Sequence, residues 1–507
     1  MQYLSRQRNP KLVSMDNNNI SLKAVVDKTN NRVVFVESDE KFVDILFSFL
    51  TMPMGTIVRL TRNRPPTASI GCLNNLYNSV EVLDNRYLRT EACMTMLLYP
   101  RNGAGAQCKN LKLAIDDGAP LRYFLCGRSD CSRSNYKLLS HYMNAICGCG
   151  QLMNCKRDLK EKESTKAVFD DQDGGVFVKG PIRMTISDEL QVIPSSTPAS
   201  HSLFSKLGIK DTTTTEERPF SMGVIQALKL LKCLLVSKTP LTEALLEYNP
   251  VLGLNNMEDV EQVSFRKLKG EETASNEDGK IYVKLMVSKS KNMVCYAEAS
   301  ENFVDLLFSF LTIPLGFLVK EMKEGSSKGC INHLYDSIQD LDAKQYLVSK
   351  ETTAMLVSPK LAPGFRYDAQ PLDIEEYMHQ PYYLTWSQCQ WFPEPTSIET
   401  LILSDETIAS SVLTVMDPKS HYNDNSSGRG FLKGPAMFTI TDDLIITPLS
   451  SVTGLSAVRK LKVPFSDVEE RIVYVGKEEA SRLMVASLVS ESALTHAFLL
   501  KESKQGS

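Results

Sequence analysis

The stretch "FVDILFSFLTMPMG" (residues 42–55) returns later in the chain, almost unchanged, as "FVDLLFSFLTIPLG" (residues 303–316). In each copy the large apolar residues recur at helical spacing, and in the first they are Phe42, Ile45, Leu46, Phe49 and Leu50. This spacing predicts a helix with one wide apolar stripe. Asp44, Ser48 and Thr51 share the other face of that helix.

Three further blocks recur in the same order in the two halves of the chain. They are "GCLNNLYNSVEVLD" (71–84) and "GCINHLYDSIQDLD" (329–342), "FVKGPIRMTISDELQVIPSS" (177–196) and "FLKGPAMFTITDDLIITPLS" (431–450), and "LVSKTPLTEALL" (235–246) and "LVSESALTHAFL" (488–499). Four colinear blocks predict two tandem copies of one domain. We expect a flexible N-terminal tail at 1–19, a first copy at 20–247 with a cysteine-rich insertion at 121–157, a polar linker at 248–280 and a second copy at 281–501.

Strand and helix patterns are mixed within each copy. In the first copy we expect β-hairpins at 21–38 and 183–194, a second amphipathic helix at 72–83 and closing helices at 222–237 and 240–246. Pro53 and Gly55 should end the first helix, and "TIVRL" (56–60) should form a short strand. Because strands and helices do not alternate regularly, the predicted fold class is α+β, with β-hairpins and amphipathic helices in both copies.

The composition is that of an ordinary globular protein: 507 residues, 43% hydrophobic, 23% charged, with a net charge of −3. This charge gives no general attraction to nucleic acid or to an anionic membrane. The N-terminus lacks the apolar core of a signal peptide, and no run is apolar enough to span a membrane. We therefore expect an intracellular protein, cytoplasmic or nuclear, whose twelve cysteines are reduced.

The sequence resembles the plant family catalogued as domain of unknown function 674. The stretches that carry the resemblance are "SLKAVVDKTNNRVVFVES", "KFVDILFSFLTMPMGTIVRL", "GCLNNLYNSVEVLD", "YFLC" with "CGCGQLMN", "ISDEL" and "LVSKTPLTEALL". The resemblance as a whole spans nearly all of the first copy and most of the second. The resemblance implies a plant protein, often built as tandem copies. No activity is assigned to the family, and no catalytic residues can be carried over from it.

The cysteines are unevenly distributed, with nine in the first copy and three in the second. The excess lies in "CGRSDC" (126–131) and "CGCGQLMNC" (147–155), which space Cys126, Cys131, Cys147 and Cys149 as two close pairs separated by a loop. Two such pairs can surround one Zn²⁺ ion with four thiolates. Gly148 and Gly150 permit the tight turn that the second pair requires. Cys155 or His141 could replace one ligand.

Two other interpretations of the cysteines stay open. They could be buried free thiols, or redox-active, although a Cys-x-x-Cys pair is absent. The corresponding region of the second copy keeps only Cys389 and contains Trp386 and Trp391 instead. We therefore expect at most one zinc, in the first copy, as a closed structural site.

The cysteine-rich segment is also basic between residues 121 and 157. Its basic residues are Arg122, Arg128, Arg133, Lys137, Lys156 and Arg157, against the single acid Asp130, and tyrosine and phenylalanine are interleaved with them. Basic and aromatic residues around a metal knuckle are typical of single-strand nucleic-acid binding. The alternative is a solvated loop whose charges offset nearby acids.

No catalytic motif is found in the chain. The acidic pairs Asp188-Glu189 and Asp442-Asp443 recur, but neighbouring acids at a short turn are typical turn formers. We therefore predict a non-catalytic binding or interaction module, with an unknown protein partner and one structural zinc. The alternatives are a nucleic-acid-binding protein that uses the basic segment, and an enzyme with a site between the two copies.

Overall fold

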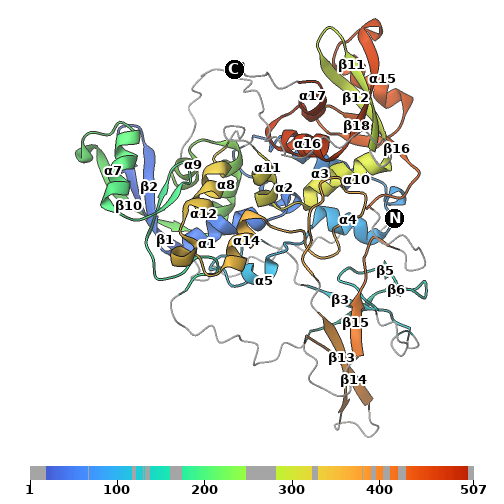
Figure 1. Cartoon of the computed structure of the whole chain (residues 1–507), viewed down its shortest axis with the longest axis horizontal. Helices are drawn as coiled ribbons and strands as arrows, with labels where there is room; N and C mark the ends of the chain where they lie inside the picture. The colour runs from blue at the N-terminus through green and yellow to red at the C-terminus, as the bar shows by residue number, and fades with distance from the viewer. Residues whose placement is uncertain are drawn as a thin grey trace.

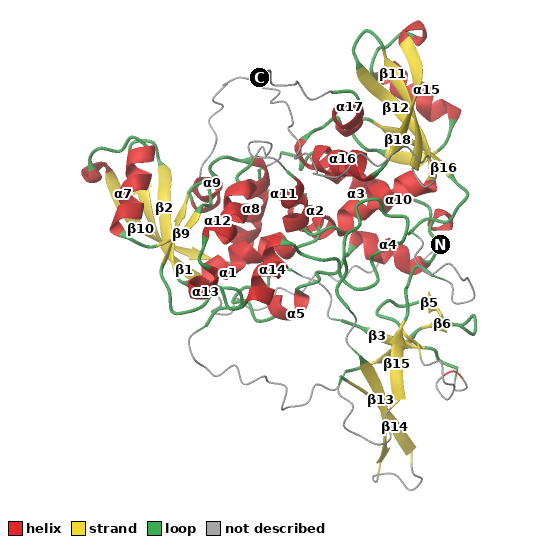
Figure 2. Cartoon of the chain, in the orientation of Figure 1, coloured by secondary structure: helices red, strands yellow, loops and turns green. Residues whose placement is uncertain are grey.

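The computed structural model describes residues 19–66, 68–116, 121–128, 131, 138–159, 174–246, 281–322, 329–378, 381–389, 396–403, 411–420 and 430–500. The predicted tail, apart from Asn19, and the predicted linker at 248–280 lie outside these ranges, as does Trp391. Helices and strands are mixed in both halves, and the strands gather in several separate sheets (Figure 2). The fold class is α+β, as the sequence predicts.

Two antiparallel five-stranded sheets stand at opposite ends of the helices (Figure 1). The first has the order β10-β1-β2-β8-β9 and the second the order β17-β16-β12-β11-β18. Their strands are β1 (Ile20–Asp27), β2 (Arg32–Ser38), β8 (Met184–Ser187), β9 (Val192–Pro194) and β10 (Thr215–Met222), and β11 (Ile281–Ser288), β12 (Met293–Ser300), β16 (Met437–Thr441), β17 (Ile446–Pro448) and β18 (Val468–Val475). Both hairpins predicted for the first half are confirmed.

The helices of both halves lie between these sheets and share one hydrophobic core. The first half supplies α1 (Glu40–Ser48), α2 (Met54–Thr61), α3 (Leu73–Val82), α4 (Glu91–Leu98), α5 (Gly105–Cys108), α8 (Val224–Val236) and α9 (Pro240–Leu245). The second half supplies α10 (Glu301–Ser309), α11 (Leu315–Glu321), α12 (Ile331–Asp340), α13 (Ala343–Tyr346), α14 (Lys350–Val357), α16 (Lys477–Val489) and α17 (Ala493–Phe498). Two more helices, α7 (Thr197–Lys206) and α15 (Ser451–Lys460), pack on the sheets themselves.

The strand predicted at residues 56–60 is wrong, because these residues lie in α2. Pro53 precedes the first residue of α2 with an extended backbone, so it starts this helix as well as ending the previous one. Proline is tolerated there because the first N–H groups of a helix have no partner within it. Gly55 is required by packing instead: a Cβ atom on it would come within 3.0 Å of the carbonyl oxygen of Leu311 in the second half.

The two halves meet beside Pro53 and its counterpart Pro314, through a reciprocal pair of backbone hydrogen bonds. Met54 donates its N–H to the carbonyl of Ile313 at 3.0 Å, and Leu315 donates to the carbonyl of Met52 at 2.9 Å. Between these bonds Pro53 and Pro314 lie opposite each other as an isolated antiparallel bridge. The helices α2 and α11 therefore begin side by side at the centre of the shared core.

One helix of each half, α3 or α12, also contacts the five-stranded sheet of the other half. In α3 the hydroxyl of Ser79 accepts the N–H of Ile446 in β17 at 2.9 Å. In α12 the hydroxyl of Ser337 accepts the N–H of Val192 in β9 at 2.9 Å. The sheets are thus completed by helices from the opposite half.

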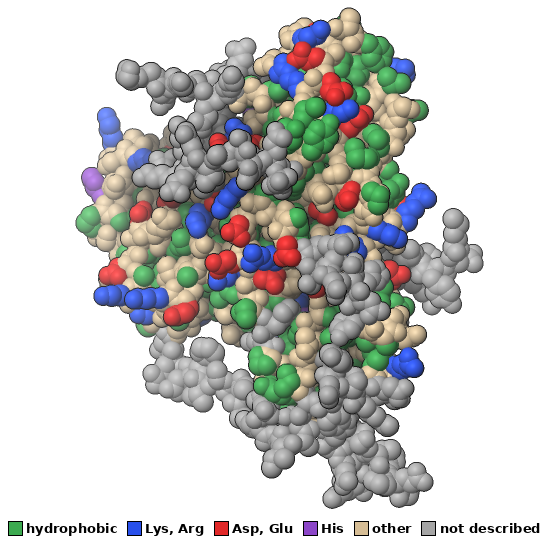
Figure 3. Space-filling view, turned by 45° about the vertical axis from the view of Figure 1, so that its right-hand side comes forward, with side chains coloured by type: hydrophobic (Ala, Val, Ile, Leu, Met, Phe, Trp, Pro, Cys, Tyr) green, Lys and Arg blue, Asp and Glu red, His purple; other side chains and the backbone are tan. Residues whose placement is uncertain are grey.

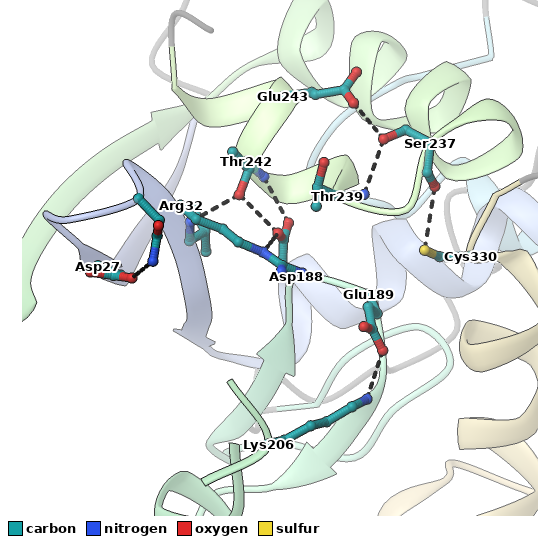
Figure 4. A network of polar contacts seen from close by, with 12 residues as sticks. Asp27, Arg32, Asp188, Glu189, Lys206, Ser237, Thr239, Thr242, Glu243 and Cys330 are labelled. Carbon is teal, nitrogen blue, oxygen red and sulfur yellow. Dashed lines mark hydrogen bonds and ion pairs between the residues drawn. The ribbon is translucent and has the colours of Figure 1, made fainter. Parts of the chain in front are cut away.

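The cysteines that precede α3 and α12 form further hydrogen bonds between the two halves. The N–H of Cys72 donates to the carbonyl of Ser487 at 2.8 Å, and that of Cys330 to the carbonyl of Leu234 at 2.9 Å. The thiol of Cys330 also donates to the carbonyl of Ser237 at the end of α8 (Figure 4). Both cysteines are buried, and their thiols serve the contact between the halves.

The polar face predicted for the first helix is buried as well. Asp44 is only 3% exposed, and its carboxylate accepts the N–H groups of Phe177 and Val178 at 2.8 and 3.0 Å. In the second half Asp305 accepts the N–H groups of Phe431 and Leu432 at 2.8 and 2.9 Å. Burial raises the pKa of Asp44 to about 6 and that of Asp305 to about 7, although these N–H groups oppose the rise.

The recurring acidic pairs do lie in turns, after β8 and β16, and the first acid of each pair is buried. The carboxylate of Asp188 accepts both the N–H and the hydroxyl of Thr242 at 2.9 Å and forms an ion pair with Arg32 (Figure 4). Asp442 accepts the same two groups of Thr495 at 2.7 and 2.6 Å. Each carboxylate thereby holds the first turn of a closing helix, α9 or α17, where a negative charge is favourable.

Substitution of Gly71 by alanine tests the contact between the halves. Gly71 has φ +48°, and a Cβ atom on it would lie 2.4 Å from the carbonyl oxygens of Ser487 and Leu488. Gly208 has φ +70° with nothing within 4 Å, so Gly208→Ala measures backbone strain alone, about 1–2 kcal/mol. We expect Gly71→Ala to cost that amount plus about 1–3 kcal/mol for the overlap. Equal losses of unfolding free energy in denaturant titrations would contradict the contact.

The buried Asp305 predicts a pH dependence of stability. Its pKa rises from 3.8 in the unfolded chain to about 7 in the fold, so the folded protein binds the proton more tightly. The stability that this group contributes is present below pH 3.8 and is lost as the pH rises through about 7. Compared with Asp305→Asn, the wild type should lose up to about 1.4 kcal/mol of unfolding free energy per pH unit in this interval. Parallel pH profiles for the two proteins would contradict this.

Candidate metal centre

The cysteine-rich segment folds into short strands that project away from the helices, at the bottom of Figure 1. These are β3 (Tyr123–Leu125), β4 (Leu138–Leu139), β5 (Ala145–Ile146), β6 (Leu152–Met153) and β7 (Cys155–Arg157). β3 pairs with β7, and β5 pairs with β6 as a small hairpin, both antiparallel. Since strands of two or three residues gain little from their own pairing, this segment depends on other contacts for its stability.

Part of that support comes from the second half of the chain. Its strands β13 (Tyr382–Cys389), β14 (Thr396–Ile402) and β15 (Ser411–Val415) form a four-stranded sheet with β4, in the order β14-β13-β15-β4. β15 runs parallel to β4. A small separate core joins the two halves here, formed by Tyr123, Leu125, Leu139, Tyr382, Leu384, Leu401 and Leu413. Trp386 and Cys389 lie on β13 of this sheet. We call the described residues of the segments 121–159 and 381–416 together the strand module.

The structure brings together the four cysteines that the spacing singled out. The Sγ atoms of Cys126, Cys131, Cys147 and Cys149 all lie within 4.8 Å of one another, and those of Cys126 and Cys149 are 3.6 Å apart. A tetrahedral Zn²⁺ site with Zn–S bonds of about 2.3 Å places its sulfur atoms about 3.8 Å apart. Within the described ranges, no other group of histidine, cysteine or acidic side chains is this compact.

Two turns hold the cysteines in place. In the first, the N–H of Cys131 donates to the carbonyl of Arg128 at 3.1 Å. In the second, between β5 and β6, Cys147 donates to the carbonyl of Gln151 and Gly150 donates to that of Cys147, both at 2.8 Å. Gly150 has φ +81°, a conformation that favours glycine, so the tight turn inferred from the sequence is present.

The protonation of the thiols is uneven. The backbone N–H of Gln151 lowers the pKa of Cys149 to about 7, and the neighbouring thiols add to this effect. Burial raises the pKa of Cys147, and hydrogen bonding to Cys149 raises that of Cys131. One thiolate, stabilised by hydrogen bonds, is therefore available near neutral pH. Binding of a cation would favour deprotonation of the others.

The two alternative ligands lie apart from this group. Cys155 accepts a hydrogen bond on its Sγ from Nη1 of Arg157 at 3.0 Å. His141 places Nδ1 3.3 Å from the carbonyl oxygen of Arg122, and its ring packs edge-on against Tyr123 and Tyr382. Neither side chain belongs to the compact group of four.

The basic residues of the segment are only partly within the described ranges. Arg122, Arg128, Lys156 and Arg157 are described, whereas Arg133 and Lys137 lie outside. Lys156 forms an ion pair with Asp158 at 3.1 Å, and Arg157 contacts Cys155 as given above. Nucleic-acid binding by this segment stays a prediction.

Comparison with models of known protein families identifies one family that matches the chain. The model of the family described as "Protein of unknown function (DUF674)" matches residues 16–478, which is most of the chain. The chain belongs to this family. No curated protein and no solved structure matches it significantly. Among the described helices, none is both long and apolar enough to cross a membrane. The family description names no activity, so function has to be argued from the residues of this chain.

The spacing of the cysteines was sufficient to single out the four thiols that lie together, but not their surroundings. β4 contains only two residues and pairs with β15, more than 250 residues later in the chain. A pattern of two residues gives no detectable signal for a strand. The association of the cysteine-rich segment with the second half is therefore visible only in the structure.

Proposed function

We propose that Cys126, Cys131, Cys147 and Cys149 bind one Zn²⁺ ion, and that the protein is a non-catalytic binding protein in which this ion has a structural role. The observation that carries the proposal is the mutual distance of the four Sγ atoms, all within 4.8 Å. Four thiolates are soft ligands and favour zinc over the hard cations magnesium and calcium.

A site with four protein ligands is closed and has no open position for water or substrate. This supports a structural role rather than a catalytic one. Iron also binds to four thiolates, so elemental analysis has to distinguish the two metals.

The ion would join the two turns that hold the cysteines. The first turn follows β3 and the second lies within the β5–β6 hairpin, and the strand pairs of both elements are short. Metal binding contributes directly to the folding free energy of such small elements. Through β4 and β15 the same ion would also stabilise the strands that the second half contributes.

The position of the strand module supports a role in binding. It contacts α4 through Asn144 and Glu91, but most of it projects beyond the helices, away from both five-stranded sheets, at one end of the molecule (Figure 1). A separate element that a metal holds rigid can present side chains to a partner at a low entropic cost. We therefore place the contact with a protein partner on this module.

The first test is the metal content of the full chain, purified under reducing conditions without added metal. We expect about one zinc per chain, because the four thiols form a single group. The double variant Cys147→Ser, Cys149→Ser should lose the metal, and Cys155→Ser should keep it as the matched control. Absence of metal from the wild type, with every thiol titratable after unfolding, would show that these cysteines are only packing residues.

Removal of the metal should act locally. Treatment of the full chain with a zinc chelator is expected to increase amide hydrogen exchange in residues 121–159 and 381–416, since these share the small strands and their core. Exchange in β1 and β2, which belong to the large core, should not change. A uniform increase over the chain, or none in the strand module, would contradict a structural role there.

A further inference from the structure

The outer edges of the two five-stranded sheets are protected unequally. At one end of each sheet, β9 and β17 receive a serine hydroxyl from a helix of the opposite half: Ser337 caps Val192 and Ser79 caps Ile446. At the other end of the first sheet, β10 contains Pro219. Helix cover and proline are both recognised means of preventing further strand pairing. β18 has neither, and no described strand pairs with its outer edge.

The two outer strands differ at the position of the proline. β10 reads "TEERPFSM" and β18 reads "VEERIVYV", so Ile472 stands where β10 has Pro219. Pro219 lies opposite Lys23 in an uninterrupted ladder with β1, although it has no N–H to donate. The amide at this position therefore points away from the ladder. Ile472 lies opposite Lys284 in the same register, so its N–H points to the open edge of β18.

The outer face beside this edge carries exposed apolar and aromatic side chains in the second sheet, around the ion pair of Lys284 with Glu470. Tyr282, Ile472 and Tyr474 are 43%, 50% and 44% exposed. The corresponding residues of the first sheet are Ser21, Pro219 and Ser221, by the registers of β1 with β10 and of β11 with β18. Figure 3 shows hydrophobic side chains gathered over the upper part of the molecule, where Figure 1 places β11, β12, β18 and α15. The second sheet thus combines an open edge with exposed tyrosine and isoleucine side chains that the first sheet lacks.

We propose that β18 pairs antiparallel with β18 of a second copy of this chain, which joins the second sheets of two molecules into one continuous sheet. A strand that pairs with itself forms a two-fold symmetric contact in which each copy offers the same surface. Among the described residues of each chain, β18 is the one edge of these two sheets that neither a helix nor a proline protects. Pairing through it therefore closes at two molecules and does not propagate into a fibre.

The charges of β18 select the register. Residues opposite each other in one sheet point to the same face, so the two-fold axis passes through a residue and not between two residues. The two residues at the centre of β18, which give the longest pairing, are Arg471 and Ile472. An axis at Arg471 would set two arginines directly against each other, which is unfavourable. An axis at Ile472 sets the two isoleucines against each other and exchanges hydrogen bonds between their outward N–H and carbonyl groups. It also places Glu470 opposite Tyr474 of the second copy, whose hydroxyl can donate to the carboxylate.

The proposal is tested on the full chain by sedimentation equilibrium over a wide range of concentration. We expect a monomer–dimer equilibrium in the wild type. Ile472→Pro reproduces the residue that β10 already accommodates in the same register, so it should abolish the dimer without loss of the fold. Ile472→Lys places two ammonium groups across the axis and should weaken the dimer at least tenfold, more so at low salt. Circular dichroism and thermal melting verify that each variant is folded.

The first sheet provides the matched control. Pro219→Ile should open the edge of β10, so that each chain has two open edges and dimers associate into larger assemblies. A wild type that is monomeric at every concentration would overturn the proposal, including the case in which β18 binds an extended peptide of another protein. A dimer that persists unchanged in both Ile472→Pro and Ile472→Lys would overturn it as well.

Discussion

Each of the helices α3 and α12 packs against the sheet of the opposite half, and the rest of the fold depends on this exchange of helices. Each helix begins at a cysteine whose N–H is bound by the end of a helix from the opposite half. Each then supplies the serine that caps an outer strand of the opposite sheet. Neither sheet has its complete helical cover from its own half. The two halves consequently share one core, and their order along the chain does not correspond to two independent bodies.

This exchange explains several residues that would otherwise look out of place. Gly71 and Gly329 stand where the chain crosses to the other half, and a Cβ atom on either would overlap with a carbonyl oxygen there. Asp44 and Asp305 are buried on the polar face of the first helix of each half, beside backbone N–H groups of the same half. In the assembled core that face is covered, and the carboxylates are retained because backbone N–H groups satisfy them.

The sequence predicted most elements correctly but could not predict how they pair. Hydrophobic spacing located α1, α3, α8 and α9 and both hairpins of the first half, because a buried stripe leaves a clear period. It failed at residues 56–60, where Pro53 and Gly55 resemble a helix end although a second helix starts at once. The exchange itself leaves no signal, because nearly identical apolar stripes in the two halves can pack within a half or between halves equally well. The compact group of four thiols was found because cysteine is rare and its spacing is informative, whereas the two-residue strand β4 carries no comparable signal.

The differences between the corresponding segments of the two halves are the most informative part of the chain. Positions that face the shared core are constrained by packing, and there the recurring blocks are nearly identical, as in residues 42–55 and 303–316. Positions on the outer faces carry no such constraint, so a consistent change there needs another cause. The first half has the group of four thiols together with Pro219 and serines on its outer sheet. The second half has no such thiol group within its described residues, but it has an unprotected strand edge and exposed tyrosines. The differences between the halves are therefore concentrated on outer surfaces, whereas both halves contribute similar residues to the common core.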